Sequence, residues 1–472
     1  MAFLSILDKQ RTVAGPGFNR WLVPPAALAL HFCIGQAYGY SVFKLPLQAA
    51  CGWKETQTQW IFSTFIAVLG ISAAIFGQWL ERVGPRRAGV TAAFCWGGGY
   101  LVSALGVKTN QLWLVYLGNG VIGGCGLGLG YISPVSTLIK WFPDRRGLAT
   151  GMAIMGFGGG ALIGAPLSNK LMEFFGAMAK DGKGVSALVK DGAAVNHGVV
   201  MTFIALGVIY FVVMIIGAMS YRIPVPDWKP IGFVPKAKAC MTLGHVHVKN
   251  AWKTVQFWLL WVVLCTNICA GISIIEDAAP MIQHIFSKES MGEKAAVTAA
   301  AAGGFVGLLS IANIFGRLGW ASASDKLGRK MTYVVIFVLG MAGFALLPTL
   351  GTQHNLALFV TTCILLLTLY GGGFATIPAY LADIFGTQFV GAIHGRLLTA
   401  WSTAGVVGPL LLNWMHEHQK AAGVPEAERY NMTFYILAGL LFVGFVCNLL
   451  VRHVDEKHHM TAEELASARA AH

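Results

Sequence analysis

Two similar stretches decide the fold: Gly77-Gln-Trp-Leu-Glu81-Arg82-Val-Gly84-Pro-Arg86-Arg87 and Ser324-Asp325-Lys326-Leu-Gly328-Arg329-Lys330. Each contains an acidic residue, a basic residue, a glycine and two further basic residues in the same order. The two acidic residues, Glu81 and Asp325, are 244 positions apart. Each stretch follows an apolar segment of about 20 residues, the length that a helix needs to cross a bilayer. The chain therefore contains an internal repeat of membrane-spanning segments.

The composition indicates a protein surrounded by lipid. Of 472 residues, 56% are hydrophobic and 12% are charged, whereas an average soluble domain has roughly 25% charged residues. The net charge is +13, but the basic residues lie in short groups between apolar segments rather than on one face. This distribution argues against a nucleic-acid partner and is typical of loops in a multi-pass membrane protein.

Counting apolar segments predicts an all-α membrane protein of twelve transmembrane helices in two pseudo-symmetric six-helix bundles. The predicted spans cover residues 21–45, 59–80, 88–107, 112–134, 147–172, 198–221, 254–284, 298–320, 331–350, 355–380, 391–414 and 431–452.

A polar stretch in the middle of the chain sets the predicted domain boundaries. We expect an N-terminal bundle over residues 1–221, a cytoplasmic linker over 222–253, and a C-terminal bundle with a short tail over 254–472. Lys and Arg are about twice as frequent on one side of the predicted membrane, and they are retained on the cytoplasmic side. We therefore expect a multi-pass protein of the inner (plasma) membrane with both termini in the cytoplasm. We also expect the protein to be monomeric.

The repeated loops resemble the signature of the major facilitator superfamily. Three further stretches, Tyr131-Ile-Ser-Pro134, Lys140-Trp-Phe-Pro-Asp144-Arg-Arg-Gly147 and Ile311-Ala-Asn313-Ile-Phe-Gly316-Arg317, resemble the oxalate/formate antiporter group and its monocarboxylate-carrier relatives. The resemblance implies a carrier that binds its substrate between two bundles and works by alternating access.

The same resemblance implies a conformational gate at the cytoplasmic ends of the helices. Its members in this sequence are Glu81, Arg82, Asp325 and Arg329. The alternative is that these charged loops only fix the topology of the chain.

Arg317 is the main candidate for substrate binding. It lies eight residues before Asp325, so its Cα is about 12 Å deeper in the membrane. An arginine at this depth usually faces a cavity or a partner, and its guanidinium can donate two parallel hydrogen bonds to a carboxylate. Asn313, one turn earlier, can orient Arg317 or bind the substrate. Alternatively, Arg317 is structural and pairs with a carboxylate or reaches the inner interface.

The number of buried cations bears on the charge of the substrate. Oxalate-exchanging members of the resembled family use a second cation, a lysine in the eleventh span, where this chain has Trp401. One buried cation neutralises one carboxylate, and a second uncompensated carboxylate would be costly. We expect a monocarboxylate such as formate, lactate or pyruvate. The alternative is an oxalate/formate-type dicarboxylate exchanger that uses Arg396 or His394, although these two residues are more simply an interfacial pair.

Several other side chains are secondary candidates. The resemblance places Tyr38, Tyr131, Tyr370 and Phe374 on the wall of the substrate site with Trp401, although each could also be ordinary packing. His31, Glu276 and Asp277 could couple transport to protons, and the two acidic residues are expected near the outer face. Thr461 and Glu464 have the spacing of a helix capping box.

Other classes of function lack their motifs. The short histidine pairs come without further ligands, so we expect no metal site, and no cofactor is expected because the phosphate-binding loop of ATP-driven proteins does not occur in the sequence. An enzyme would need a cluster of His, Asp or Cys side chains at one face of the membrane, and we find no such cluster in the sequence. A substrate sensor built on a transporter fold is the remaining alternative. The sequence leaves open whether protons or a counter-anion accompany the carboxylate.

Overall fold

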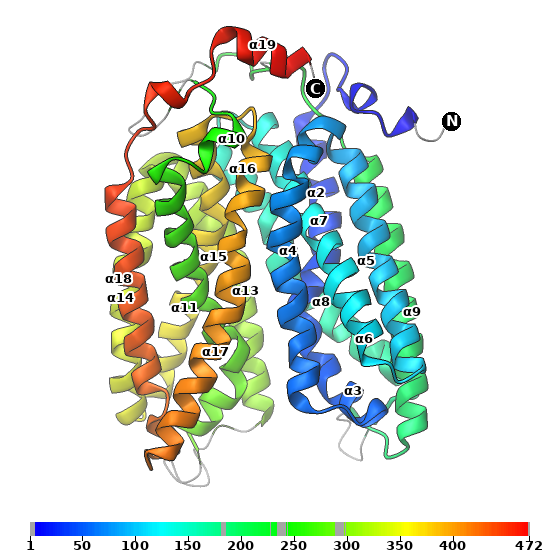
Figure 1. Ribbon diagram of the computed structural model, residues 1–472. Coiled ribbons are helices and arrows are strands. Elements are labelled where there is room, and N and C mark those ends of the chain that lie inside the picture. Colours follow the sequence, from blue (N-terminus) through cyan, green and yellow to red (C-terminus); the bar gives the residue numbers. More distant parts are fainter. Residues whose placement is uncertain are drawn as a thin grey trace.

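The computed structural model describes residues 5–180, 186–226, 228–233, 242, 244–287, 297 and 299–470. Its long apolar segments form helices, because in lipid every main-chain N–H and C=O must be paired within the segment. The helices stand side by side in two groups (Figure 1), with α2 to α9 in the first group and α11 to α18 in the second. Both chain termini lie at one end of the bundle, which we call the terminal end.

Ten helical segments in the described ranges are long and apolar enough to cross a membrane. They are α4 (Glu55–Val83), α5 (Pro85–Lys108), the continuous α6 (Leu112–Val115), π-helical η4 (Tyr116–Gly123) and α7 (Gly124–Trp141), α8 (Arg146–Phe174), α9 (Gly192–Met219), α11 (Val255–Ile285), α13 (Ala299–Leu327), α14 (Arg329–Thr352), α15 (Leu356–Phe385) and α18 (Asn431–Leu450).

The other two predicted spans, 21–45 and 391–414, are interrupted helices. The first is divided among η2 (Arg20–Leu22), α2 (Val23–Ile34), the 3-10 helix η3 (Gly35–Phe43) and α3 (Lys44–Cys51), and the second between α16 (Val390–Leu397) and α17 (Thr399–Ala421). The all-helical membrane fold is therefore confirmed, while the count of twelve spans stays a prediction.

Close approach of two backbones accompanies the first interruption. A Cβ atom built on Gly160 of α8 would lie 2.4 Å from the backbone of Gly35, where α2 gives way to η3. Only glycine fits at such a contact, and small residues allow helices in a membrane to pack closely. The interrupted helix is therefore held against α8 inside the first group.

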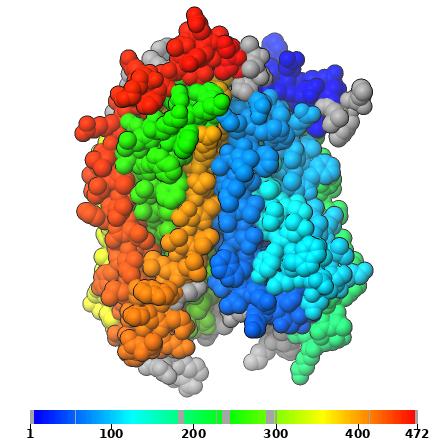
Figure 2. Space-filling view, viewed as in Figure 1, coloured from blue at the N-terminus to red at the C-terminus, as the bar shows by residue number. Residues whose placement is uncertain are grey.

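Two seams join the helix groups. At one seam α8 packs against α13 and α15, and at the other α4 packs against α16 and α17. Figure 2 shows the second seam from outside, where the blue α4 meets the orange α17. Residues on α8, α13, α15 and α17 are therefore positioned to form a site between the groups.

Non-helical segments cover the terminal end. Val13 pairs with Ile223 in a parallel bridge, and Val246 pairs with His459 in an antiparallel one. The short helices at this end are η1 (Lys9–Thr12), α10 (Val248–Ala251), η6 (Glu456–His458) and α19 (Ala462–Ala470). At the opposite end, η5 (Glu426–Glu428) connects α17 to α18, and the antiparallel hairpin of β1 (Met178–Lys180) and β2 (Ser186–Leu188) connects α8 to α9.

The predicted capping box precedes α19. The N–H of Glu464 donates to Thr461 Oγ1 at 3.2 Å, and the N–H of Thr461 donates to Glu464 Oε2 at 3.0 Å. Thr461 and Glu464 therefore satisfy each other's main-chain donors at the start of this helix.

Candidate functional site

Arg317 lies on α13 at the seam with α8, and its side chain is 0% exposed. Its Nε donates to Asn313 Oδ1 at 3.0 Å, one helical turn away, and its Nη1 donates to the carbonyl of Ile154 on α8 at 3.3 Å. Nη2 has no hydrogen-bonding partner of ordinary geometry within the described part of the chain. The salt bridges among the described residues do not include Arg317. The guanidinium is therefore buried with an amide and a carbonyl as its partners, rather than a carboxylate.

Aromatic rings surround the guanidinium. Its Cζ lies 5.0 Å from the ring centre of Phe374 and 5.9 Å from that of Phe157. Trp401 contacts both rings, with centroids 4.7 Å from Phe374 and 5.2 Å from Phe157, and Tyr131 contacts Trp401 at 5.3 Å. Cation–π attraction lowers the cost of burying the charge. The rings also exclude water, which strengthens the interaction of the guanidinium with an anion.

Tyr38 and Tyr370 contact the aromatic rings of the site and link the two helix groups. Their hydroxyl oxygens are 2.9 Å apart, which is a hydrogen bond between η3 and α15. The Tyr38 hydroxyl is also close enough to Arg317 and Trp401 to interact with both. The six residues predicted to accompany Arg317 (Asn313, Tyr38, Tyr131, Tyr370, Phe374 and Trp401) thus lie together around it.

Five buried polar atoms near Arg317 have no hydrogen-bonding partner of ordinary geometry in the described part of the chain. An unpaired buried polar group costs about 1–3 kcal/mol, so several together indicate where a ligand supplies the missing partners. Among the described residues near the aromatic rings, these atoms are Arg317 Nη2, Tyr131 Oη, Trp401 Nε1, His394 Nδ1 and His394 Nε2.

Phe157 was missed by the sequence analysis. It lies between two glycines, Gly156 and Gly158, in the fifth predicted span. The two flanking glycines are the sequence signal that could have revealed Phe157, because they leave room for a neighbouring side chain. A Cβ atom on Gly158 would lie 2.9 Å from Arg317 Nε. The glycines let the arginine and the ring come together.

The predicted gate residue Glu81 connects the two helix groups near the terminal end. Its Oε2 accepts from Lys140 Nζ at 2.7 Å, and its Oε1 accepts from the N–H of Gly391 at 3.1 Å. Gly391 is in the first turn of α16, where a negative charge is stabilised by the unpaired N–H groups and the helix dipole. A carboxylate of one group thereby caps a helix of the other.

Asp325 makes the symmetry-related contact. It accepts from the N–H groups of Gly147 and Leu148, in the first turn of α8, at 2.8 and 2.9 Å, and from Arg329 at 2.7 Å. Arg329 also pairs with Asp383 at 3.1 Å. The two acidic residues of the repeated loops therefore each hold the start of a helix in the opposite group.

The fourth predicted gate residue, Arg82, lies apart from these contacts. Its side chain is exposed, and none of the described ion pairs includes it. Instead, the ion pairs near Glu81 and Arg329 include Lys140 with Glu81, and Arg146 with Asp383 at 2.8 Å. In the sequence, Asp383 lies just before Gly386 at the end of the tenth predicted span. The fourth predicted span also ends in charged residues, and this parallel is the signal that could have revealed Asp383.

The predicted second cations do not form a pair. His394 is 1% exposed, and its ring lies 5.8 Å from that of Tyr131. Arg396 donates instead to the carbonyl of Val248 at 2.8 Å. Residues two apart on a helix point in different directions, so an interfacial position fits Arg396 and not His394.

The three candidates for proton coupling occupy different places. His31 is buried, with Nδ1 against the carbonyl of Ala153 and Nε2 3.2 Å from that of Tyr131. At the end opposite the termini, Glu276 accepts from Gln59 of the first helix group at 3.1 Å, and Asp277 accepts from Tyr430 at 2.7 Å. The ranges that the structure describes contain no group of three potential metal ligands.

Comparison with known proteins identifies the family. The family model of the Major Facilitator Superfamily matches residues 26–409 and 320–471. The chain belongs to the Major Facilitator Superfamily. This superfamily member is thus a membrane transporter and not an enzyme, as the repeated loops predicted.

Its curated relatives include carriers of small organic anions. The oxalate:formate antiporter of Oxalobacter formigenes is 25% identical over 457 residues, which cover 95% of this chain and 96% of that protein. The apicoplast pyruvate carrier 1 of Toxoplasma gondii is 24% identical over 376 residues, covering 72% and 66%. Among solved structures, the E. coli fucose:proton symporter has a TM-score of 0.62 at 13% identity, covering 93% of this chain and 98% of that one, which supports the fold.

Proposed function

We propose that this superfamily member is a secondary active transporter of small monocarboxylates, with Arg317 as the residue that binds the carboxylate. The observation that carries the proposal is a buried guanidinium whose Nη2 has no partner of ordinary geometry in the described part of the chain. A charge at this depth is costly unless it is compensated. A carboxylate fits because a guanidinium can donate two parallel hydrogen bonds to it.

The surroundings of Arg317 favour a small substrate with one negative charge. Trp401 and Phe374 offer ring surfaces, Trp401 and Tyr131 offer one N–H and one O–H donor, and none of these groups is a cation. A single carboxylate would neutralise Arg317, and its apolar remainder would pack against the rings. Formate, lactate and pyruvate have this chemistry, and the names of two relatives, an oxalate:formate antiporter and a pyruvate carrier, include formate and pyruvate.

A dicarboxylate exchanger is the second candidate function, and one observation favours it. Both ring nitrogens of His394 are buried without partners among the described residues. A protonated His394 would place a second positive charge beside Tyr131, which suits a dianion such as oxalate.

The transport cycle that we propose uses the contacts of Glu81 and Asp325 as the gate. The two bundles, residues 1–221 and 254–472 joined by the linker 222–253, would rock about the site, and both acidic residues would leave their helix starts when the terminal end opens. Substrate binding would neutralise Arg317 and allow this movement. By the excess of basic residues we place the terminal end in the cytoplasm and the protein in the inner membrane. We propose that a monomer carries out this cycle, because both helix groups of the chain contribute residues to the site around Arg317.

Uptake into proteoliposomes tests the proposal. Labelled formate, lactate, pyruvate and oxalate would be offered to vesicles with and without internal counter-substrate and a pH gradient. We expect uptake of a monocarboxylate by the wild type, loss of uptake in Arg317→Gln, and normal uptake in Arg82→Gln, the matched exposed control. Dependence on counter-substrate indicates exchange, and dependence on the pH gradient indicates proton symport.

The other outcomes separate the alternatives. Oxalate uptake that is lost in His394→Gln would favour the dicarboxylate exchanger. Binding of a carboxylate without any uptake would indicate a sensor. Normal uptake by Arg317→Gln would refute the role of Arg317.

A further inference from the structure

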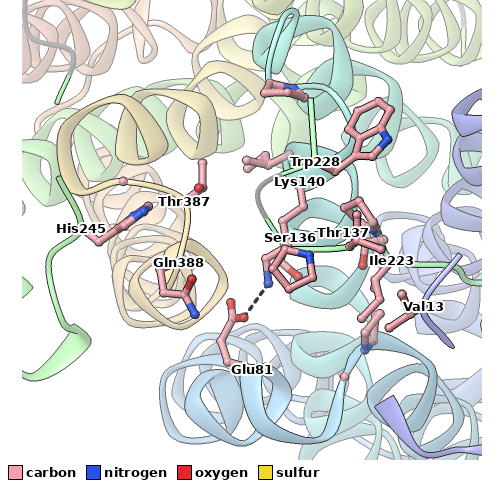
Figure 3. Close-up of a pocket in the computed structure, with 18 of the residues that line it drawn as sticks. Val13, Glu81, Ser136, Thr137, Lys140, Ile223, Trp228, His245, Thr387 and Gln388 are labelled. Carbon is pink, nitrogen blue, oxygen red and sulfur yellow. Dashed lines mark hydrogen bonds and ion pairs between the residues drawn. The ribbon is translucent and has the colours of Figure 1, made fainter. Parts of the chain in front are cut away.

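A cavity of about 530 Å³ lies at the terminal end, apart from the Arg317 site. Figure 3 shows it between the two helix groups, with Glu81 and Lys140 on one side and Thr387 and Gln388 on the other. The N-terminal segment and the stretch after α9 complete its wall through Val13 and other residues. The cavity is thus next to the contact between Glu81 and Gly391.

Positive charge dominates the wall of this cavity. Its lining includes four basic side chains, Lys9, Lys140, Arg146 and Lys229, and one acidic side chain, Glu81. Arg146 is already paired with Asp383. Among the described lining residues, the remaining charges leave an excess of positive potential in a partly open cavity, where screening by water is weaker than at a flat surface.

Lys9 is one of the basic side chains in the cavity wall. Burial lowers the pKa of its ammonium group, and the nearby charge of Lys140 lowers it further, while Glu81 opposes the change. Its Nζ donates to the main-chain carbonyl of Glu81 at 2.8 Å. The ammonium groups of Lys9 and Lys140 are therefore close enough to repel each other, and an anion between them would relieve this repulsion.

Glu81 shows which chemistry fits beside Lys140. Its carboxylate bridges the Lys140 ammonium and the first turn of α16. The side chain of Glu81 is only 5% exposed, whereas that of Lys140 is 30% exposed. An ammonium group has three donors on a flexible stem, so Lys140 can turn from Glu81 toward an anion in the cavity.

We propose that this cavity binds a small oxyanion, a carboxylate or a phosphate, between Lys9 and Lys140. The bound oxyanion draws Lys140 away from Glu81 and leaves a buried carboxylate with weaker compensation, which is unfavourable. The contact between Glu81 and Gly391 then loosens, while Asp325, which does not line the cavity among the described residues, keeps its own contact. An anion at the terminal end therefore promotes the opening of one of the two gate contacts. This site does not use Arg317, so it is independent of the proposed substrate site.

Hydrogen exchange of the full-length protein in detergent tests the proposal. The amide of Gly391 is protected by its bond to Glu81, so loosening this contact raises its exchange. We expect inorganic phosphate or acetate at millimolar concentration to raise the exchange rate of a peptide covering residues 389–394 by about threefold or more. Sodium chloride of equal ionic strength is expected to have no such effect. A response to phosphate alone or to acetate alone would identify the oxyanion that the cavity prefers.

Variants distinguish this site from a general effect of salt. Lys9→Gln removes one of the two proposed ligands, and Thr387→Trp fills the cavity without removing a charge. Both are expected to abolish the response. Lys326→Gln, which removes an exposed charge at the same end, and Arg317→Gln are expected to respond as the wild type does. A failure of the carboxylate transport proposal would leave these results unchanged.

Three results would overturn the proposal. These are unchanged exchange with both oxyanions, an equal response to chloride, and a full response in the folded Lys9→Gln and Thr387→Trp variants.

Discussion

The carboxylate of Asp325, at the end of α13, accepts the main-chain N–H of Gly147, at the start of α8, at 2.8 Å. These residues belong to different helix groups and are 178 positions apart. A full negative charge at a helix start is favourable by about 0.3–1 kcal/mol, and by up to about 2 kcal/mol when it is partly buried. The contact therefore stabilises the arrangement in which the end of α13 meets the start of α8 at the terminal end.

Replacing this charge is expected to loosen the terminal end. In Asp325→Asn the amide oxygen can still accept one N–H, but the charge interaction with the helix start and with Arg329 is lost. We expect hydrogen exchange at residues 146–149 to increase, because local opening becomes less costly by about 1 kcal/mol. Asp455→Asn, which removes an exposed carboxylate at the same end, should leave this exchange unchanged. Equal effects of the two variants would contradict a specific role for Asp325.

The hydrogen bond between Tyr38 and Tyr370 should couple the helix groups at the substrate site. We expect Tyr38→Phe and Tyr370→Phe each to weaken binding of the transported acid, and the double variant to lose less than the sum of the two effects. A coupling free energy of about 1 kcal/mol is typical of one hydrogen bond. Equilibrium binding of the labelled acid in a double-mutant cycle measures it. Strictly additive losses would show that the two hydroxyls act independently.

The ion pair between Arg20 and Asp144 predicts a pH-dependent stability. Arg20 donates to both oxygens of Asp144, at 2.6 and 2.9 Å. Burial by itself raises the pKa of this carboxyl group, but the hydrogen bonds and charge of Arg20 outweigh it and lower the pKa below its ordinary value. The pair thus adds stability above the ordinary Asp pKa of about 3.9, and this stability is lost as the pH falls through the lower pKa of the folded protein.

Thermal unfolding measures this effect. We expect Asp144→Asn to unfold at a lower temperature than the wild type at pH 7, with a cost of about 1 kcal/mol or less for a partly exposed pair. The difference should shrink below about pH 4. Arg145→Gln, at 3.8 Å from the same carboxylate and 60% exposed, should have a smaller effect. A difference that grows on acidification would show the opposite sign for the pKa shift.

A pair of glycine substitutions tests the close helix contact in the first group. Gly160→Ala would place a Cβ atom 2.4 Å from the backbone of Gly35, and we expect it to destabilise the protein by about 1–3 kcal/mol through overpacking. Gly319→Ala is the matched control, since nothing lies within 4 Å of its Cβ position on α13. It should be neutral or stabilise the helix by up to about 1 kcal/mol. Unfolding of both variants in detergent gives the comparison, and equal stability of the two would refute the tight contact.

Local patterns in the sequence were enough to predict the general architecture. The apolar segments, the repeated charged loops and the capping spacing of Thr461 and Glu464 depend on neighbours within a few turns, so they are visible without a structure. The depth of Arg317 also follows from helical rise alone. For this reason the family and the helical membrane fold were predicted correctly.

The partners of those residues depend on packing between the two helix groups. Phe157 beside Arg317, Asp383 beside Arg329, and the start of α16 beside Glu81 come from distant parts of the chain, and no local periodicity brings them together. The separation of His394 from Arg396 and the exposure of Arg82 also depend on how each helix is rotated about its axis.

The sequence by itself determined a repeated, all-helical membrane transporter with an arginine at depth, because hydrophobic length and charge placement act locally along the chain. Only the tertiary structure decided what surrounds that arginine, which helix starts the acidic residues cap, and that a basic cavity adjoins Glu81. The physical reason is that a buried charge must be compensated by whatever groups the packing brings within reach, and these groups lie on the opposite helix group.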